Sequence, residues 1–127
     1  MARAGHVSWA LGLVFLIGAT QALSAGTCRY GVCFGALAVG DGGVAARIAN
    51  EPTAHHAFAA ADRICRGGCT AIEIFHSGCG EIVQGGRTDL FSGFGETRED
   101  AHAQALDACG KANHRSCVVR VRACTRR

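Results

Sequence analysis

Hydrophobic residues recur at helical spacing in two stretches of the chain, residues 57–65 and 101–109, which are forty-four positions apart. In each stretch the small or apolar positions are i, i+1, i+4, i+7 and i+8, which form one stripe of an amphipathic helix. The predicted buried positions are Ala57, Phe58, Ala61, Ile64 and Cys65 in the first helix, and Ala101, His102, Ala105, Ala108 and Cys109 in the second. Thr53 and Thr97 are predicted N-caps, and Gly67 and Gly110 are predicted to end the helices.

Alternating patterns typical of strands flank both helices. Upstream of the first helix, "GALAV", the turn "GDGG" and "VAARIA" predict a hairpin, and residues 80–84 and 90–95 repeat this order before the second helix. Downstream, "TAIEIF" and "CVVRVRAC" predict a further strand each. The alternation in the last strand predicts one face with Val119, Val121 and Ala123, and the opposite face with Arg120 and Arg122.

The unit is therefore strand, strand, helix, strand, and it occurs twice, at about residues 34–78 and 79–124. We predict an α+β fold in which the two tandem repeats form one antiparallel sheet with both helices on one face.

The first 25 residues have the composition of a secretory signal peptide. Arg3 precedes an apolar run over residues 7–18, and the small-residue segment "ATQALSA" follows it. The run is shorter than the roughly 20 residues that cross a bilayer, which disfavours a retained anchor. We predict cleavage after Ser24 or Ala25, a secreted or periplasmic location, no transmembrane segment after processing, and a single duplicated domain over residues 26–127.

All eight cysteines lie in the predicted mature chain, and their spacing lacks the paired knuckles of a zinc site. A dense, even cysteine set in an exported chain indicates a disulfide framework. If the two repeats are equivalent, Cys65–Cys69 and Cys109–Cys117 each connect a helix end to the next strand. Two further bridges complete the set: Cys79–Cys124, expected to join the two halves, and Cys28–Cys33 near the mature start.

Several segments resemble a secreted bacterial family, catalogued as domain of unknown function 4189. They are "FGALAV" at 34–39, "SGCGEIV" at 77–83, "GFGETREDAHAQALDAC" at 93–109 and the terminal "VRAC". The resemblance covers nearly all of the mature chain and implies an exported bacterial protein with a cysteine-stapled, duplicated fold. It implies no catalytic residues. Glu81 departs from the family, which usually has a small apolar residue there, and Cys28 and Cys33 are additional.

The sequence predicts no catalytic, cofactor-binding or metal-binding residues, and it favours a protein that is not an enzyme. His55 and His56 lie at the start of the first helix, but a general base needs a positioned partner, and none is evident nearby. His102 is expected to be packed at the boundary of the core.

Charge gives a further indication. The mature chain has twelve basic and ten acidic side chains, whereas its C-terminal part has a local excess of arginine, with Arg120, Arg122, Arg126 and Arg127. This weakly basic surface is compatible with a protein partner. Specific nucleic-acid binding is not expected, because no aromatic side chains interleave with the arginines.

The predicted function is an exported binding or interaction module. One alternative is a small secreted, hydrolase-like enzyme that uses a histidine at the first helix. Another is an inhibitor or immunity-type protein.

Overall fold

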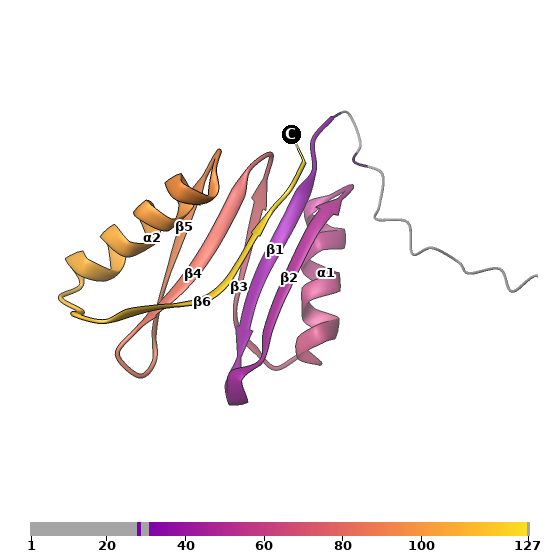
Figure 1. The fold of residues 1–127 in the computed structure, drawn as a ribbon. Coiled ribbons are helices and arrows are strands. Elements are labelled where there is room, and N and C mark those ends of the chain that lie inside the picture. Colours follow the sequence, from indigo (N-terminus) through magenta and orange to yellow (C-terminus); the bar gives the residue numbers. More distant parts are fainter. Residues whose placement is uncertain (1–27, 29–30, 127) are drawn as a thin grey trace, which may run out of the picture.

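The computed structural model describes Cys28 and residues 31–126; the predicted signal peptide and Arg127 lie outside this part of the chain. The first repeat consists of β1 (Phe34–Gly40), the short 3₁₀ turn η1 (Asp41–Gly43), β2 (Ala45–Glu51), α1 (Ala54–Cys65) and β3 (Cys69–His76). The second consists of β4 (Cys79–Gly85), β5 (Asp89–Gly95), α2 (Arg98–Lys111) and β6 (Cys117–Cys124). The duplicated order of strand, strand, helix and strand, and with it the α+β class, is confirmed (Figure 1).

The strands do not form the single sheet that the sequence suggested. They form two three-stranded antiparallel sheets with the orders β2-β1-β3 and β5-β4-β6. In both repeats the strand after the helix pairs with the free side of the first strand, so β1 and β4 are central. The expectation of both helices on one face is also wrong, because α1 covers the first sheet and α2 covers the second, on opposite sides of the molecule (Figure 1).

The composition of β1 explains this arrangement. Ala36 and Ala38 pack with buried alanines of β2 and α1. Leu37 and Val39, which point to the other face, pack with Phe75 and with Ile82 and Val121 of the second sheet. A strand that is apolar on both faces needs a layer on each side. The molecule is therefore built in four layers, in the order helix, sheet, sheet, helix.

Small side chains set the distance between each helix and its sheet. Ala57 and Ala61 of α1, and Ala101, Ala105 and Cys109 of α2, are buried. A methyl group added at Gly93 of β5 would lie 2.1 Å from the Ala101 carbonyl oxygen, so α2 touches the backbone of the sheet.

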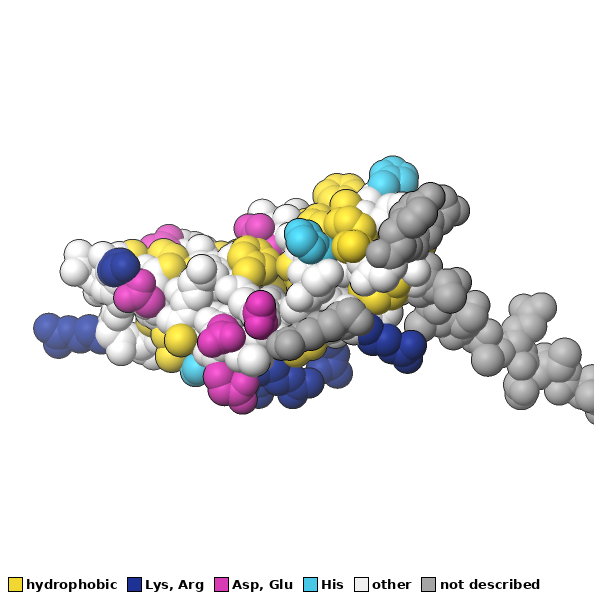
Figure 2. All heavy atoms as spheres, turned by 90° about the horizontal axis from the view of Figure 1, so that it is seen from above, with side chains coloured by type: hydrophobic (Ala, Val, Ile, Leu, Met, Phe, Trp, Pro, Cys, Tyr) yellow, Lys and Arg dark blue, Asp and Glu magenta, His cyan; other side chains and the backbone are white. Residues whose placement is uncertain are grey.

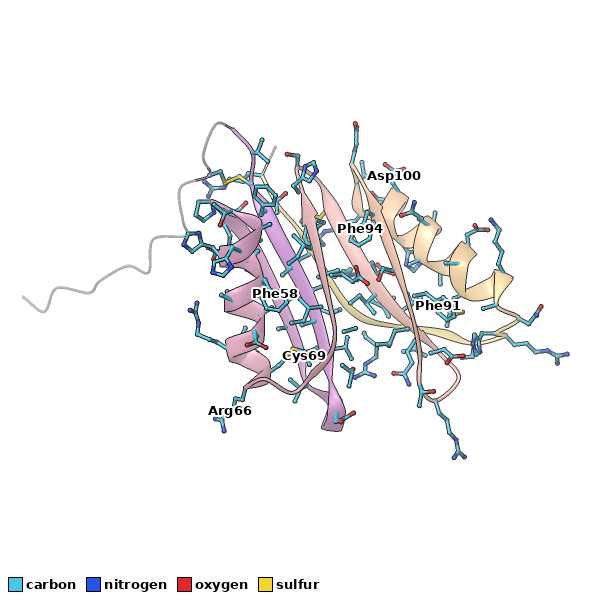
Figure 3. The ribbon with its side chains drawn as sticks, turned by 180° about the vertical axis from the view of Figure 1, so that it is seen from behind. Phe58, Arg66, Cys69, Phe91, Phe94 and Asp100 are labelled. Atoms are coloured by element: carbon cyan, nitrogen blue, oxygen red, sulfur yellow. A yellow bond between two sulfur atoms is a disulfide. The ribbon has the colours of Figure 1, made fainter. Side chains whose placement is uncertain are left out.

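Two predicted core positions of α1 are wrong for this reason. Phe58 is 46% exposed and Ile64 is 50% exposed, because only the narrow alanine ridge fits against the sheet. Figure 3 shows Phe58 on the side of the molecule that faces away from the viewer in Figure 1.

Helix starts follow the prediction more closely than helix ends. Thr53 and Thr97 each accept a hydrogen bond from the backbone N–H three residues later, at 3.1 Å. Helix α1 ends at Cys65, and Arg66 and Gly67 both adopt positive φ values. Helix α2 continues through Gly110 to Lys111, so Gly110 does not end it.

All eight cysteines form disulfides, in the pairs that the repeat suggested: Cys28–Cys33, Cys65–Cys69, Cys79–Cys124 and Cys109–Cys117. Two of them tie a helix end to the following strand. Cys79 and Cys124 are register partners on β4 and β6, so their bridge lies within the second sheet. The expectation that it joins the two halves is wrong, because Cys79 begins the second repeat rather than ending the first.

Candidate functional site: an arginine groove between the two sheets

Strand β6 connects the two sheets along one side of the molecule. Beyond its end, the backbone N–H of Thr125 donates to the Gly78 carbonyl at 2.8 Å. The N–H of Arg126 donates to the Asn50 side chain on β2 at 2.7 Å. The edge strand of the second sheet is thereby fixed beside β2, the edge strand of the first sheet.

A β-bulge in β6 determines where its arginines lie. Val121 pairs with Ile82 and Val119 pairs with Val83, so Arg120 is an extra residue without a register partner. A bulge of this kind changes the alternation of side chains along the strand. The predicted face with Val119, Val121 and Ala123 is therefore wrong: Val121 is buried between the sheets, whereas Val119 is 37% exposed.

The space between β2 and β6 is a hollow of about 300 Å³ that we call the arginine groove. Its lining residues are Ala45, Arg47, Val119, Arg120, Val121 and Arg122. None of these described lining residues is acidic. Arg47 and Arg120 therefore give the groove a positive charge beside small and aliphatic side chains, which suits an anionic partner. Arg122 is the register partner of Glu81, which faces α2, so its side chain points to the α2 side of β6.

A second hollow, of about 500 Å³, adjoins the groove and shares Arg120 with it. It lies between the η1 turn and the turn that follows β4, and Arg87, Gln84 and Asp41 are among its lining residues. Two arginines and one aspartate face this space, so its local charge is also positive.

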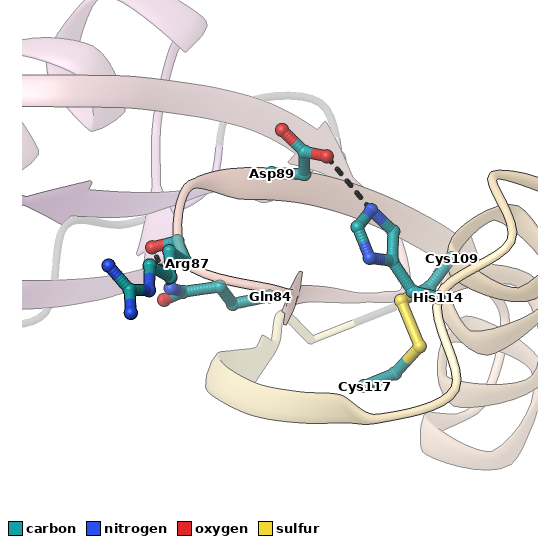
Figure 4. A network of polar contacts seen from close by, with 6 residues as sticks. All are labelled: Gln84, Arg87, Asp89, Cys109, His114 and Cys117. Atoms are coloured by element: carbon teal, nitrogen blue, oxygen red, sulfur yellow. Dashed lines mark hydrogen bonds and ion pairs between the residues drawn. A yellow bond between two sulfur atoms is a disulfide. The ribbon is translucent and has the colours of Figure 1, made fainter.

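Arg120 is held in place by a short chain of hydrogen bonds. Its Nη1 donates to the Oε1 atom of Gln84, and Gln84 Nε2 in turn donates to the Arg87 backbone carbonyl. Figure 4 shows the contact between Gln84 and Arg87. Arg120 is half-buried, whereas Arg47 and Arg122 are exposed. One of the five N–H donors of a guanidinium is thus used for positioning, and the others are free for a partner.

The space-filling view shows how these charges are distributed. Several Lys and Arg side chains lie at the lower edge of Figure 2, the side that carries β6 in Figure 1, next to some Asp and Glu side chains, and a group of hydrophobic and histidine side chains lies at the upper right. The opposite edge of the sheets has a different hollow, of about 400 Å³, lined by Phe75 and Phe94 and by no arginine among the described residues. Phe94 is labelled on that face in Figure 3.

The predicted basic surface is only partly assembled. Arg120 and Arg122 line the groove, Arg126 is exposed beyond the end of β6, and Arg127 lies outside the described residues. The sequence reasoning missed Arg47 and Arg87, which come from β2 and the β4–β5 turn. No local pattern marks them, because Arg47 approaches β6 only through the packing of the two sheets, and Arg87 only through the pairing of β4 with β6.

The sequence reasoning also missed a buried ionisable pair. Glu81 of β4 is 1% exposed, and its Oε1 atom lies 2.6 Å from Nδ1 of His102 on α2. The His102 side chain is 43% exposed, so it connects a buried carboxyl to the surface. His102 is thus at the core boundary, as expected. Its contact with Glu81 offsets part of the cost of burying that carboxyl group under α2.

Three further histidines, His55, His56 and His114, have local partners. His56 Nδ1 lies 2.8 Å from the hydroxyl of its own helix cap, Thr53, and the rings of His55 and His56 are 6.3 Å apart. His114 Nε2 lies 2.8 Å from Asp89 Oδ2, beside the Cys109–Cys117 bridge (Figure 4). Within residues 31–126, no cluster of three or more His, Cys, Asp or Glu side chains is arranged to hold a metal ion.

One further charged pair lies away from the groove, on α2. Lys111 Nζ donates to Asp107 Oδ2 at 2.7 Å, and this hydrogen bond and the negative charge of Asp107 raise the pKa of Lys111. Lys111 is therefore cationic, but it is paired and is not part of the arginine groove.

Comparison with known proteins places the chain in one family. Residues 34–124 match the family described as Domain of unknown function (DUF4189), and the chain belongs to it. The match begins with β1 and ends with β6, so it covers both repeats. No curated protein and no solved structure matches the chain. No helix among the described residues is long and apolar enough to cross a membrane.

The Glu81–His102 pair generates a stability prediction. His102→Ala leaves a buried carboxyl without its partner, and we expect a loss of about 3 kcal/mol in the free energy of unfolding. The double variant Glu81→Ala/His102→Ala removes both polar side chains, and it should recover part of this loss. Urea denaturation of the unchanged protein, the single variant and the double variant measures these free energies of unfolding.

The exposed pair between His114 and Asp89 is the matched control. Asp89 is 60% exposed, so Asp89→Asn should cost at most about 1 kcal/mol. If His102→Ala is as stable as the unchanged protein, Glu81 does not depend on His102.

Proposed function

We propose that this protein is an exported, disulfide-stabilised binding module that acts in the periplasm or outside the cell, and that it contacts an anionic partner through the arginine groove. The observation that carries the proposal is the groove itself, which is lined by arginines of two sheets, Arg47 on β2 and Arg120 and Arg122 on β6, with no acidic residue among the described lining residues. Arg120 is also fixed by Gln84, so part of the binding surface is already ordered before a partner arrives.

A simpler explanation for the arginines is protection of a sheet edge. Charged side chains and bulges on edge strands prevent sheets from pairing with one another, and β6 has both features. Edge protection requires only mobile charges on the edge strand, however. It accounts for Arg47, since β2 is also an edge strand, but neither for the hydrogen bonds that hold Arg120 nor for the contribution of Arg87 from the β4–β5 turn.

The hydrolase-like alternative receives no comparable support. His55 and His56 are exposed in the first turn of α1, and neither is in an ion pair with a carboxylate of the described residues. Such a base needs a partner that orients it. An inhibitor or immunity-type protein would be a special case of the binding module, and no contact in the molecule selects it.

Export is supported by the basic start, apolar run and small-residue segment of residues 1–25, and by the four disulfides, which persist in oxidising compartments. We expect the full-length protein, expressed in a bacterium, to appear outside the cytoplasm with Ala25 or Gly26 as its first residue. Intact mass before and after alkylation checks this, and no thiol should react without reduction. A full-length cytoplasmic product, or one with alkylatable thiols, would contradict export.

Binding through the groove is tested with heparin, a soluble sulfated polyanion. The triple variant Arg47→Gln/Arg120→Gln/Arg122→Gln should bind at least about tenfold more weakly than the unchanged domain, because it removes the three positive charges along the groove. The heparin affinity of this variant should also fall less steeply as the salt concentration rises. Circular dichroism confirms that the variant is folded.

The control removes the same net charge elsewhere. Arg63 and Arg66 at the end of α1 and Arg98 at the start of α2 are exposed and do not line the groove, so Arg63→Gln/Arg66→Gln/Arg98→Gln should keep most of the affinity. Equal losses in the two triple variants would mean that only net charge matters, and the groove would not be a site.

A further inference from the structure

The arginine groove follows the open edge of β6, which the hydrogen bonds of the fold leave free. β6 pairs with β4 on one side, and no other described strand pairs with it. An edge strand presents a row of backbone N–H and C=O groups that can accept another strand. The outer edge of β6 thus has backbone groups that no described strand uses, and it borders the hollow between β6 and β2.

The residues that line the groove indicate that it runs along this edge. Val119, Arg120, Val121 and Arg122 all line it, although successive side chains of a strand point to opposite faces. Val121 packs between the sheets, while Val119 pairs with Val83 on the side of α2. A hollow on one face of the sheet would not be lined by residues from both faces of β6, so the groove borders the unpaired edge of this strand.

The charge of the groove selects the kind of strand that fits. Arginines on both walls and no carboxylate among the described lining residues favour a chain with several acidic side chains. A second copy of this chain would bring the same arginines into contact with each other, so self-pairing is disfavoured.

The side chains next to the arginines match a polypeptide better than a nucleic acid. Val118 is 57% exposed and Val119 is 37% exposed, and no described aromatic residue lines the groove for stacking of bases. Exposed valines beside arginines fit a strand that alternates acidic with small or β-branched residues, because such a strand presents both kinds of side chain to β6.

We propose that an extended acidic segment of a partner protein adds to the free edge of β6 as a further strand, with its carboxylates on Arg47 and Arg120. Backbone hydrogen bonds supply affinity, and the arginines supply selectivity for acidic sequences. This inference rests on the proposed function, since it specifies the partner of the same groove.

The test uses the mature domain with intact disulfides and a synthetic octapeptide, acetyl-(Glu-Thr)₄-amide. Two isomers carry the same charge: one is N-methylated at every threonine and the other at every glutamate. In an extended chain the N–H groups of alternate residues point to the same edge, so each isomer lacks the donors of one edge. Affinity is measured by isothermal titration calorimetry or by NMR titration.

Strand addition uses only one edge of the peptide. We therefore expect one isomer to bind at least about tenfold more weakly than the other, which corresponds to about 1.4 kcal/mol of lost backbone hydrogen bonding. Amide hydrogen exchange within residues 118–122 should slow when the unmethylated peptide is bound. The substitution Arg120→Gln should weaken the binding of the unmethylated peptide, and the matched surface substitution Arg98→Gln should not.

The outcomes separate this inference from the proposed function. Isomers that bind equally well, or a peptide that does not bind while heparin still depends on the groove arginines, would overturn strand addition and leave the anionic-partner proposal standing. If substitution of the groove arginines changes neither the affinity for heparin nor the affinity for the peptide, both proposals are wrong.

Discussion

The face-to-face packing of the two sheets is the contact on which the rest of the molecule depends. Leu37 of β1 and Ile82 of β4 are fully buried in the cluster between the sheets, and Phe75 and Val121 complete it. Gly80 permits the close approach, since an added Cβ would lie 3.0 Å from the Leu37 Cδ1 atom and 3.1 Å from Phe75 Cδ1. The edges of the two sheets meet along β2 and β6 because of this packing, and the arginine groove exists only where they meet.

The disulfides stabilise each repeat internally. The contact between the two sheets depends instead on buried apolar side chains and a few hydrogen bonds. No bridge joins an element of one sheet to an element of the other. Between the sheets, the Arg126 N–H donates to Asn50, and apolar side chains fill the remaining space. The hydrophobic effect therefore holds the two repeats together, and oxidised cysteines keep each repeat in the shape that this contact needs.

Much of each repeat could be predicted from the sequence, because its signals are local. The threonine caps, the alanine stripe and the spacing of cysteines at element ends all act within a few residues of one another. The arrangement of the repeats could not be predicted in the same way, although "FGALAVG" carried a signal: its two apolar faces exclude a sheet that is covered on one side only.

The groove was less accessible to sequence reasoning, since it depends on contacts far apart in the chain. The bulge at Arg120 follows from the register of β6 against β4, and "VVRVR" alone reads as plain alternation. Arg47 approaches Arg120 only after both sheets have formed. Glu81 and His102 were each noticeable in the sequence. Their pairing could not be predicted, because it depends on β4 and α2 turning both side chains toward the space between the strand and the helix.

A nuclear Overhauser measurement on the isotope-labelled mature domain tests the packing of the sheets most directly. The two-sheet arrangement predicts strong cross-peaks from the Leu37 δ-methyl protons to the Gly80 α-protons, and from methyl groups of Leu37 or Val39 to those of Ile82 or Val121. If these cross-peaks are absent, and cross-peaks between α1 and α2 appear instead, the repeats share one sheet with both helices on the same face, and the two sheets do not pack face to face.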